Sequence, residues 1–220
     1  LDHPQLVQEV FATPSAVEQS GDLFSRLDAL GLEVTLTDER VLASLSTTET
    51  PQGVVAVCRQ LHVELDEVTS PKLVVMLSNI RDPGNAGTIL RVADAAAADA
   101  VFFSENSVDL YNPKVVRSTT GSIFHLKVAI DQTVEKVFAF ARSHGMQILA
   151  ADATGTAIDE LPPESLERPT LWVFGNEAWG FEPGVLSQVD AVVSVPIFGK
   201  AESLNLATAA SICIYASAMA

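Results

Sequence analysis

Apolar residues in the last two-thirds of the chain form short continuous runs, separated by longer segments with helical spacing. The run Leu73–Leu77 contains no polar residue, which is typical of a strand buried on both faces of a parallel sheet. Pro83-Gly84-Asn85 is typical of a turn that begins a helix, and the apolar positions 89, 92, 93 and 96 follow helical periodicity. Further strands are predicted at 100–103, 147–151, 171–174 and 191–195, and further helices at 112–119, 134–142 and 204–218. This alternation predicts an α/β fold with a parallel sheet.

The first seventy residues show a shorter alternation. It predicts strands at 5–12, 32–36 and 54–58, a loop leading into a helix at 15–30, and a short helix at 41–45 that the polar run 46–50 ends. This pattern indicates a small α/β domain, and we expect an opening element to be missing because the chain starts directly on Leu1-Asp2. The acidic segment 64–71, closed by Pro71, is the best candidate for a linker. We therefore expect two domains, at 1–70 and 71–220.

Composition narrows the class of protein. Hydrophobic residues make up 48% of the 220 positions, which is enough for a buried core. The apolar stretch at 206–220 is shorter than the roughly 20 residues of a membrane span, and no basic region followed by an apolar one opens the chain. Cys58 and Cys213 have no partner at metal-ligand spacing, and the four histidines are scattered. We therefore expect no metal site and interpret the cysteines as core residues of a cytoplasmic protein.

The charge of the chain is strongly acidic. Thirteen Lys and Arg against 28 Asp and Glu give a net charge of −15, whereas nucleic-acid binders usually carry a basic excess. The acidic residues are concentrated in the first seventy residues and at 152–167, and several cations lie beside the glycine-containing segments. A nucleic-acid site would therefore be a local cationic groove on an acidic body. Its candidate residues are Arg81, Arg91, Lys114, Arg117 and Lys200.

Three segments contain candidate chemistry. The strand at 171–174 runs into the loop G-N-E-A-W-G at 175–180, and the strand at 191–195 runs into a second loop that ends on S-L-N at 203–205. Ligands collect beyond the carboxyl ends of parallel strands, where glycine lets the backbone approach them closely. Neither loop matches a P-loop or the dinucleotide fingerprint. The third segment, 79–91, places Asn85 at a helix start and Arg91 almost two turns later, which suits an anion such as phosphate.

Each of these residues also has a purely structural interpretation. Asn85 could cap its helix, and Arg91 could be a solvated surface charge. Glu177 could be an exposed loop carboxylate, and Ser203 with Asn205 could form the N-cap of the last helix. Taken singly, the residues leave these alternatives open.

Taken together, the segments resemble the three signature motifs of the SpoU/TrmH branch of the SPOUT RNA methyltransferases. The motifs read N-x-R-D-P-G-N-x-G-x-I-x-R from residue 79, F-G-N-E-x-W-G from residue 174, and V-P-I-x-G-x-x-x-S-L-N-x-x-x-A from residue 195. The stretch from Asn112 to His125 is also similar to this family, so the resemblance extends over 72–220. Residues 1–70 resemble the small substrate-recognition domain that often precedes the catalytic domain, here shortened.

The resemblance implies a fold, a cofactor and partners. It implies a parallel sheet with a deep trefoil knot at its C-terminal end, S-adenosylmethionine as the methyl donor, RNA as the substrate, and a homodimer with the last helix near the interface. The residues that match catalytic positions are Asn85, Arg91, Glu177, Ser203 and Asn205. The residues that would form the cofactor pocket are Ala151, Gly175, Asn176, Gly180, Val195, Ile197 and Leu204.

The implied reaction is an in-line methyl transfer to a ribose 2′-hydroxyl. In this family Arg91 is cast as the base that activates the hydroxyl, but arginine keeps its proton because its pKa lies above about 12. We favour a role in which Arg91 binds the neighbouring phosphate and stabilises the developing alkoxide. Ser203 and Asn205 would then orient the substrate or the loop, and Glu177 would hold its own loop in place.

Two other functions are open at this point. One is a catalytically silent RNA-binding factor on the same fold, and the other is a nucleotide enzyme of the Rossmann type. The small N-terminal domain favours ribosomal RNA as the substrate, with transfer RNA as the alternative. A housekeeping role and a role in antibiotic resistance would use identical motifs.

Overall fold

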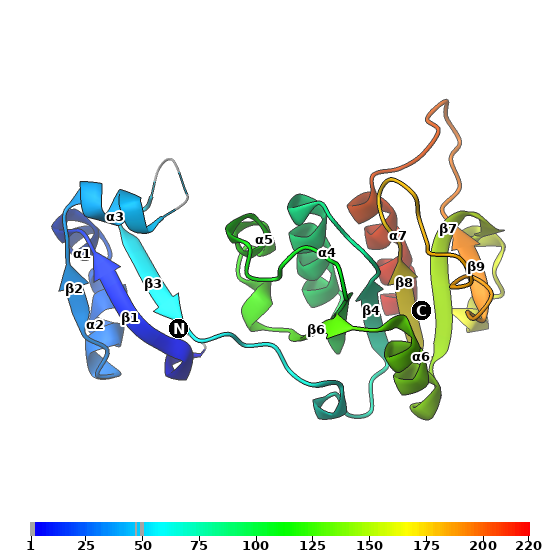
Figure 1. Cartoon of the computed structure of the whole chain (residues 1–220), viewed down its shortest axis with the longest axis horizontal. Coiled ribbons are helices and arrows are strands. Elements are labelled where there is room, and N and C mark those ends of the chain that lie inside the picture. Colours follow the sequence, from blue (N-terminus) through cyan, green and yellow to red (C-terminus); the bar gives the residue numbers. More distant parts are fainter. Residues whose placement is uncertain (1–2, 47, 49–50) are drawn as a thin grey trace. The chain divides into compact units, whose positions relative to one another are not determined.

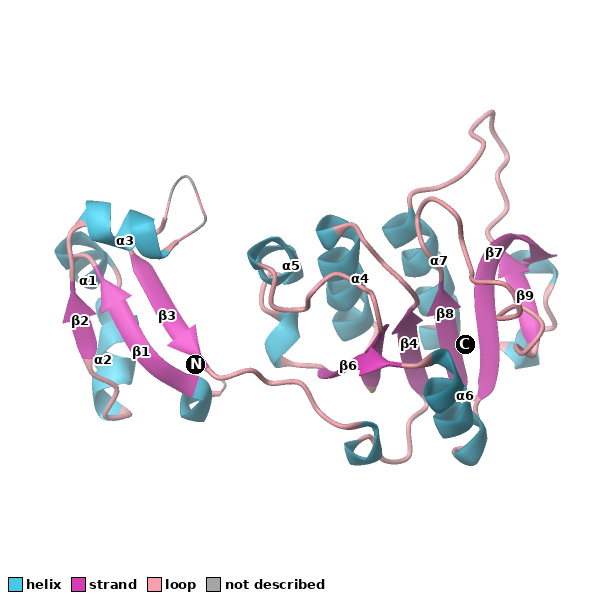
Figure 2. Ribbon diagram, viewed as in Figure 1, coloured by secondary structure: helices cyan, strands magenta, loops and turns pink. Residues whose placement is uncertain are grey.

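The chain divides into two compact units, Leu1–Leu61 and His62–Ala220. The structure is a computed structural model that describes residues 3–46, 48 and 51–220. Each unit has its own sheet, and the elements of both can be followed along the chain in Figure 1 and by type in Figure 2.

The first unit is a three-stranded sheet with the order β2-β1-β3. The central strand β1 (Val7–Ala12) is parallel to β2 (Val34–Leu36) and antiparallel to β3 (Val54–Cys58). Val10 of β1 and Leu42 are both buried, which places the core between the sheet and its helices. The helices of this unit are α1 (Pro14–Gln19), α2 (Gly21–Ala29) and α3 (Glu39–Leu45), and a 3-10 turn at Pro4–Leu6 precedes β1.

The second unit is a six-stranded, all-parallel sheet with the order β6-β5-β4-β8-β7-β9. Every residue of β4, β5 and β8 is buried, as the uninterrupted apolar runs of these strands require. The strands are β4 (Leu73–Leu77), β5 (Ala100–Ser104), β6 (Lys127–Gln132), β7 (Gln147–Ala157), β8 (Thr170–Phe174) and β9 (Ala191–Ser194).

Helices cover both faces of this sheet. Alternate strand residues such as Met76 and Phe102 form one buried cluster with α6 (Val134–Ser143). On the other face α4 (Pro83–Ala95) packs against α7 (Leu206–Ala218), and α5 (Pro113–Thr119) packs against α4. The indole N–H of Trp172 on β8 donates a 2.9 Å hydrogen bond to Ser217 Oγ on α7. The last helix is thereby fixed to the centre of the sheet.

The strand order places three irregular segments at the same end of the sheet, beside the carboxyl ends of its strands. The chain moves outward from β4 to β6, returns to β7 and then enters the middle of the sheet as β8, so β4 and β8 are neighbours although they are distant in sequence. Ala151 and Thr156 of β7 both pair with Val193 of β9, so residues 152–155 form a bulge. A side chain at Gly155 would come within 2.4 Å of the Val192 carbonyl, so glycine is needed there for β7 to rejoin β9. The bulge and the loops after β8 and β9 therefore lie at the carboxyl ends of adjacent strands.

The predicted α/β architecture with a parallel sheet is confirmed, and several elements differ from the prediction. The segment 15–30, predicted as a loop and one helix, forms the two helices α1 and α2. Strand β6 was not predicted because it is an edge strand with only three consecutive apolar residues and polar ends. Strand β7 continues to Ala157, beyond the predicted end at 151. The polar run predicted at 46–50 includes residues 47, 49 and 50, which lie outside the described residues.

The segment predicted to be a linker, 64–71, belongs to the second unit. Val68 is buried in the cluster beneath α6, and the Val63 N–H donates a hydrogen bond to the Val128 carbonyl of β6. A 3-10 turn at Leu65–Glu67 also forms there. The division between the units accordingly falls at 61/62. The acidic residues that suggested a linker form a turn at the surface while the apolar residues between them pack.

The two cysteines provide a test of this fold. Cys58 is exposed at the end of β3, so its interpretation as a core residue is wrong, although burial of part of its thiol raises its pKa. Cys213 is buried in α7, and burial raises the pKa of its thiol to about 12. We expect a thiol reagent at about pH 8 to modify only Cys58 in the native protein, faster as the pH rises because more thiolate forms. Rapid modification of both cysteines without denaturant would contradict this packing of α7, and Cys58→Ser should abolish the native reaction.

Candidate functional site

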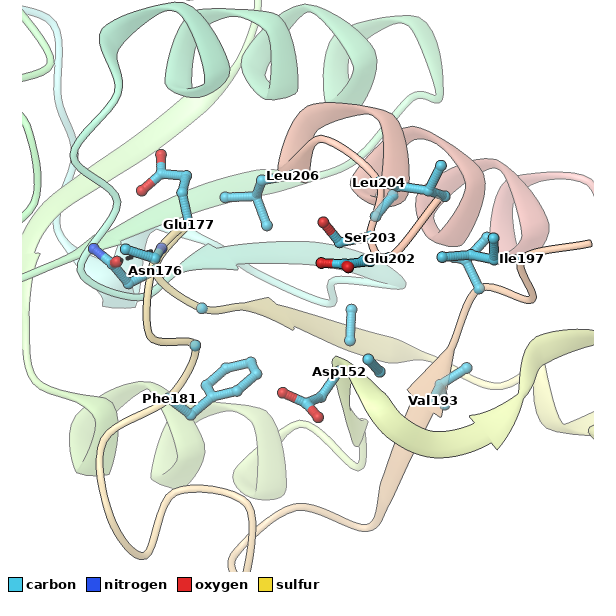
Figure 3. Close-up of a pocket in the computed structure, with 17 residues that line it drawn as sticks. Asp152, Asn176, Glu177, Phe181, Val193, Ile197, Glu202, Ser203, Leu204 and Leu206 are labelled. Atoms are coloured by element: carbon cyan, nitrogen blue, oxygen red, sulfur yellow. Dashed lines mark hydrogen bonds between the residues drawn. The ribbon is translucent and has the colours of Figure 1, made fainter. Parts of the chain in front are cut away.

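A pocket of about 260 Å³ opens at the carboxyl ends of β7, β8 and β9. Its walls are residues 151–153 of β7, where the bulge begins, the loop at 175–181 that follows β8 (the β8 loop), and the loop at 195–205 between β9 and α7 (the β9–α7 loop). Figure 3 shows side chains from all three segments around the pocket. The strand order predicts a ligand site at this edge, because adjacent connections diverge there.

The β8 loop is shaped by its backbone. The N–H of Asn176 donates to the Gly180 carbonyl at 2.7 Å, and the N–H of Gly180 donates back to the Asn176 carbonyl at 3.0 Å. Gly180 has a φ of +73°, and a side chain at Gly175 would lie 2.6 Å from the Gly180 carbonyl oxygen. The Asn176 side chain is buried and donates to the Asn79 carbonyl at 2.7 Å, while its oxygen accepts the Ala178 N–H at 2.8 Å. The loop is therefore a closed turn, held by hydrogen bonds of its own backbone and of the Asn176 side chain.

Glu177 connects the β8 loop to the start of α4. Its carboxylate accepts hydrogen bonds from the backbone N–H groups of Arg81 at 3.2 Å and Asp82 at 3.1 Å, and from Asn85 Nδ2 at 3.3 Å. Asp82 is the residue that caps α4, since its Oδ1 accepts the Asn85 N–H at 2.7 Å. The interpretation of Asn85 as the helix cap is therefore wrong. With the cap supplied by Asp82, the Asn85 side chain is available for contacts between segments.

Asn205 extends this chain of contacts to α7. Its Nδ2 donates to Asn85 Oδ1 at 2.9 Å, and its Oδ1 accepts the N–H groups of Ala207 and Thr208 at the start of α7. Asn205 is thus the N-cap of α7, as one of the structural interpretations proposed, and it also contacts Asn85. These contacts fix the orientation of both amides. The Glu177 carboxylate can only accept, so Asn85 must turn its Nδ2 towards it, and the backbone N–H groups of α7 can only donate, so Asn205 must turn its Oδ1 towards them. The relay runs from α7 through Asn205 and Asn85 to Glu177.

All seven residues predicted for the cofactor line the one pocket. Of the five residues predicted to be catalytic, Glu177 and Ser203 line the pocket. Asn85 is hydrogen-bonded to Glu177, and Asn205 is hydrogen-bonded to Asn85. Arg91 is exposed on α4, and its guanidinium has no hydrogen bond or ion pair with the described residues. The five cations predicted for RNA are all exposed, and none of them lines the pocket.

Several residues at the pocket were not predicted. Asp152 lies in the β7 bulge and is half-buried, and Phe181 and Glu202 line the pocket from its two loops. The only sequence signal for Asp152 was its position just after a strand end. In the part of the chain that the structure describes, no group of three His, Cys, Asp or Glu side chains is placed to hold a metal ion, and no helix is long and apolar enough to cross a membrane.

Comparison with known proteins identifies the family. Residues 72–215 match the model of the SpoU rRNA Methylase family. The chain belongs to this family. Residues 1–63 match a second family model, described as RNA 2′-O ribose methyltransferase substrate binding. The two SpoU-type matches correspond to the two units of the structure.

Similar proteins extend the SpoU comparison over both units. The 23S rRNA (guanosine(2553)-2′-O)-methyltransferase RlmP of Bacillus subtilis is 30% identical, with 98% of this chain and 86% of RlmP covered. An AdoMet-bound rRNA methyltransferase from Sinorhizobium meliloti has a TM-score of 0.81 at 28% identity, covering 96% of this chain and 79% of that one. The SpoU methyltransferase AviRb from Streptomyces viridochromogenes, in complex with AdoMet, has a TM-score of 0.84 at 26% identity, covering 97% and 82%.

The relay can be tested by placing a second carboxylate in it. Asn85→Asp sets a charged oxygen at about the 3.3 Å that separates Asn85 Nδ2 from Glu177, and we expect a loss of about 1 kcal/mol in unfolding free energy at pH 7. The repulsion is electrostatic, so the loss should shrink when salt is added. Urea unfolding at low and high ionic strength measures it. Asn85→Ala is the control, because it removes the hydrogen bonds without adding charge, and its cost should change less with salt.

Proposed function

We propose that this chain transfers a methyl group from S-adenosylmethionine to a ribose 2′-hydroxyl of ribosomal RNA. The observation that supports this best is the pocket at the ends of β7, β8 and β9 in a chain of the SpoU family. The curated relative named above, RlmP, is a 23S rRNA 2′-O-methyltransferase, and the two similar structures named above contain AdoMet. Transfer RNA remains the alternative substrate.

The residues around the pocket fit this cofactor. Gly175 lets the β8 loop close on Gly180, and Val195, Ile197 and Leu204 supply an apolar wall for an adenine and its ribose. Ala151 would line the adenine side and Asn176 would shape the floor of the loop. When bound, the cofactor supplies an activated methyl group on a positively charged sulfur. The protein contributes by holding the hydroxyl in line with that group and excluding water.

The relay gives the proposed catalytic residues distinct tasks. Glu177 holds the β8 loop against α4 through its three hydrogen bonds. Asn85 and Asn205 have fixed amide orientations, so each presents a defined polar edge to the substrate beside the pocket. Ser203 lines the pocket with an exposed hydroxyl that can orient the ribose. Arg91 binds the neighbouring phosphate and stabilises the alkoxide as the hydroxyl loses its proton.

The proposed function also includes an RNA-binding surface and a dimeric assembly. The first unit recognises the RNA, and the exposed cations Arg81, Lys114, Arg117 and Lys200 contact its phosphates. The functional protein is a cytoplasmic homodimer with a trefoil knot formed by the β8 and β9–α7 loops. Exposed apolar side chains at helical spacing on α7 and at its C-cap support the dimer, because such a stripe is suited to the core of an interface. They are Ile212, Tyr215 and Met219.

Methyl transfer to unmodified ribosomal RNA transcripts tests the function. We expect label from methyl-tritiated S-adenosylmethionine to enter RNA as a dinucleotide that resists alkaline hydrolysis, because a methylated 2′-oxygen cannot attack its phosphate. Leu204→Arg, which places a charged side chain in the pocket wall, should reduce cofactor binding by at least tenfold in calorimetry and abolish the transfer.

Leu36→Arg is the matched control for this variant. It adds the same charge at a leucine that is already 61% exposed on β2 of the first unit, so its cofactor binding should equal that of the wild type. Label found only in alkali-labile products would contradict 2′-O-methylation. Label in transfer RNA but not in ribosomal transcripts would select the alternative substrate.

A separate variant tests the role of Arg91. A guanidinium that clamps a phosphate offers two parallel N–H donors, which lysine cannot supply. We expect Arg91→Lys to lower kcat/KM for RNA by at least tenfold while the cofactor dissociation constant stays unchanged, since Arg91 does not line the pocket. Methyl transfer by Arg91→Lys at nearly the wild-type rate would rule out any task that needs the guanidinium.

A further inference from the structure

The charged side chains that line the pocket are all acidic. Asp152, Glu177 and Glu202 contribute three carboxylates, and no Lys, Arg or His among the described residues lines it. Two of the three were not assigned a task above. Figure 3 shows that Asp152 and Glu202 come from different segments, the β7 bulge and the β9–α7 loop. More than one element of the fold therefore supplies negative charge to the pocket.

The carboxylates differ in how fully they are engaged. Glu177 accepts three N–H groups, so much of its charge is balanced within the protein. Asp152 uses only Oδ1, which accepts the N–H and hydroxyl of Thr154 at 2.9 and 2.7 Å. Its Oδ2 lies beside Gly180 of the β8 loop, since a side chain at Gly180 would come within 3.6 Å of it. Glu202 is exposed and accepts no hydrogen bond from the described residues. The negative charges of Asp152 and Glu202 are therefore less balanced within the protein than that of Glu177, and a ligand in the pocket would be attracted by them if it is a cation.

The proposed reaction changes the charge of the ligand in this pocket. S-adenosylmethionine has a sulfonium, an ammonium and a carboxylate, and therefore a net charge of +1. As the 2′-oxygen bonds to the methyl carbon and gives its proton to water, the carbon–sulfur bond breaks and its electron pair stays on sulfur. The product, S-adenosylhomocysteine, is a neutral thioether with a net charge of zero. An anionic pocket consequently attracts the donor more than the product.

We infer that Asp152 and Glu202 determine the selectivity of the pocket for the methyl donor over its spent product. This inference rests on the proposed function, because it concerns the same pocket and cofactor. The two carboxylates act on the sulfonium through the electrostatic field of the pocket, and their attraction weakens as methyl transfer discharges the sulfur. They therefore favour donor binding and product release and do not accelerate the chemical step.

Calorimetry with both ligands tests the inference. We expect Asp152→Asn to weaken S-adenosylmethionine binding by about fivefold and to leave S-adenosylhomocysteine binding within about twofold, with a similar, smaller effect for Glu202→Gln. The Asp152→Asn oxygen can still accept both Thr154 hydrogen bonds, so the bulge should be preserved. Asp159→Asn, the same change at an exposed aspartate that does not line the pocket, is the matched control.

The outcomes separate this inference from the proposed function. Equal weakening of both ligands by Asp152→Asn would overturn the inference, because it would assign the carboxylate to a group that donor and product share. Unchanged binding of both ligands in Asp152→Asn and Glu202→Gln would also overturn it. A wild-type protein that binds neither ligand would refute the proposed function itself. A lower ratio of product to donor dissociation constants in both variants, with wild-type thermal unfolding, supports the inference.

Discussion

The carboxylate of Glu177 is the contact on which the geometry of the site depends. It belongs to the loop after β8, yet its three donors come from the start of α4, almost a hundred residues earlier in the chain. Through Asn85 and Asn205 the same carboxylate is connected to the first turn of α7. Each donor is an N–H group that the end of a helix or a side-chain amide leaves unused. One anion thus fixes three segments that the sheet alone would leave as independent loops.

The rest of the pocket is formed by backbone. Gly175 allows the β8 loop to close on Gly180, and Gly155 allows β7 to bulge and still rejoin β9. Both positions are places where any side chain would collide with backbone atoms, which cannot move without breaking strand pairs. The bulge also directs Asp152 into the pocket. The parallel sheet therefore determines where the pocket lies, and the glycines in the β7 bulge and after β8 determine how closely these segments can pack around it.

The sequence predicted the sheet and the pocket better than it predicted the contacts between loops. Buried strands such as β4 and β8 are unbroken apolar runs, so their position was readable, and the glycines after them indicated a ligand site. The edge strand β6 lacks that signal. The sequence left open whether Asn85 caps α4, because Asp82 and Asn85 are both good capping residues three positions apart and only the three-dimensional structure distinguishes them. Asp152 was missed because a four-residue bulge leaves no periodicity in the sequence.

The acidic composition becomes understandable when the two ligands are considered together. RNA is a polyanion and the methyl donor is a cation, so a uniformly basic surface would favour the substrate at the expense of the donor and would bind RNA of any sequence. Here the pocket is acidic, and the exposed cations assigned to RNA lie outside it. With a net charge of −15, the chain as a whole repels a polyanion, so the proposed affinity for RNA depends on short-range contacts with the local cations.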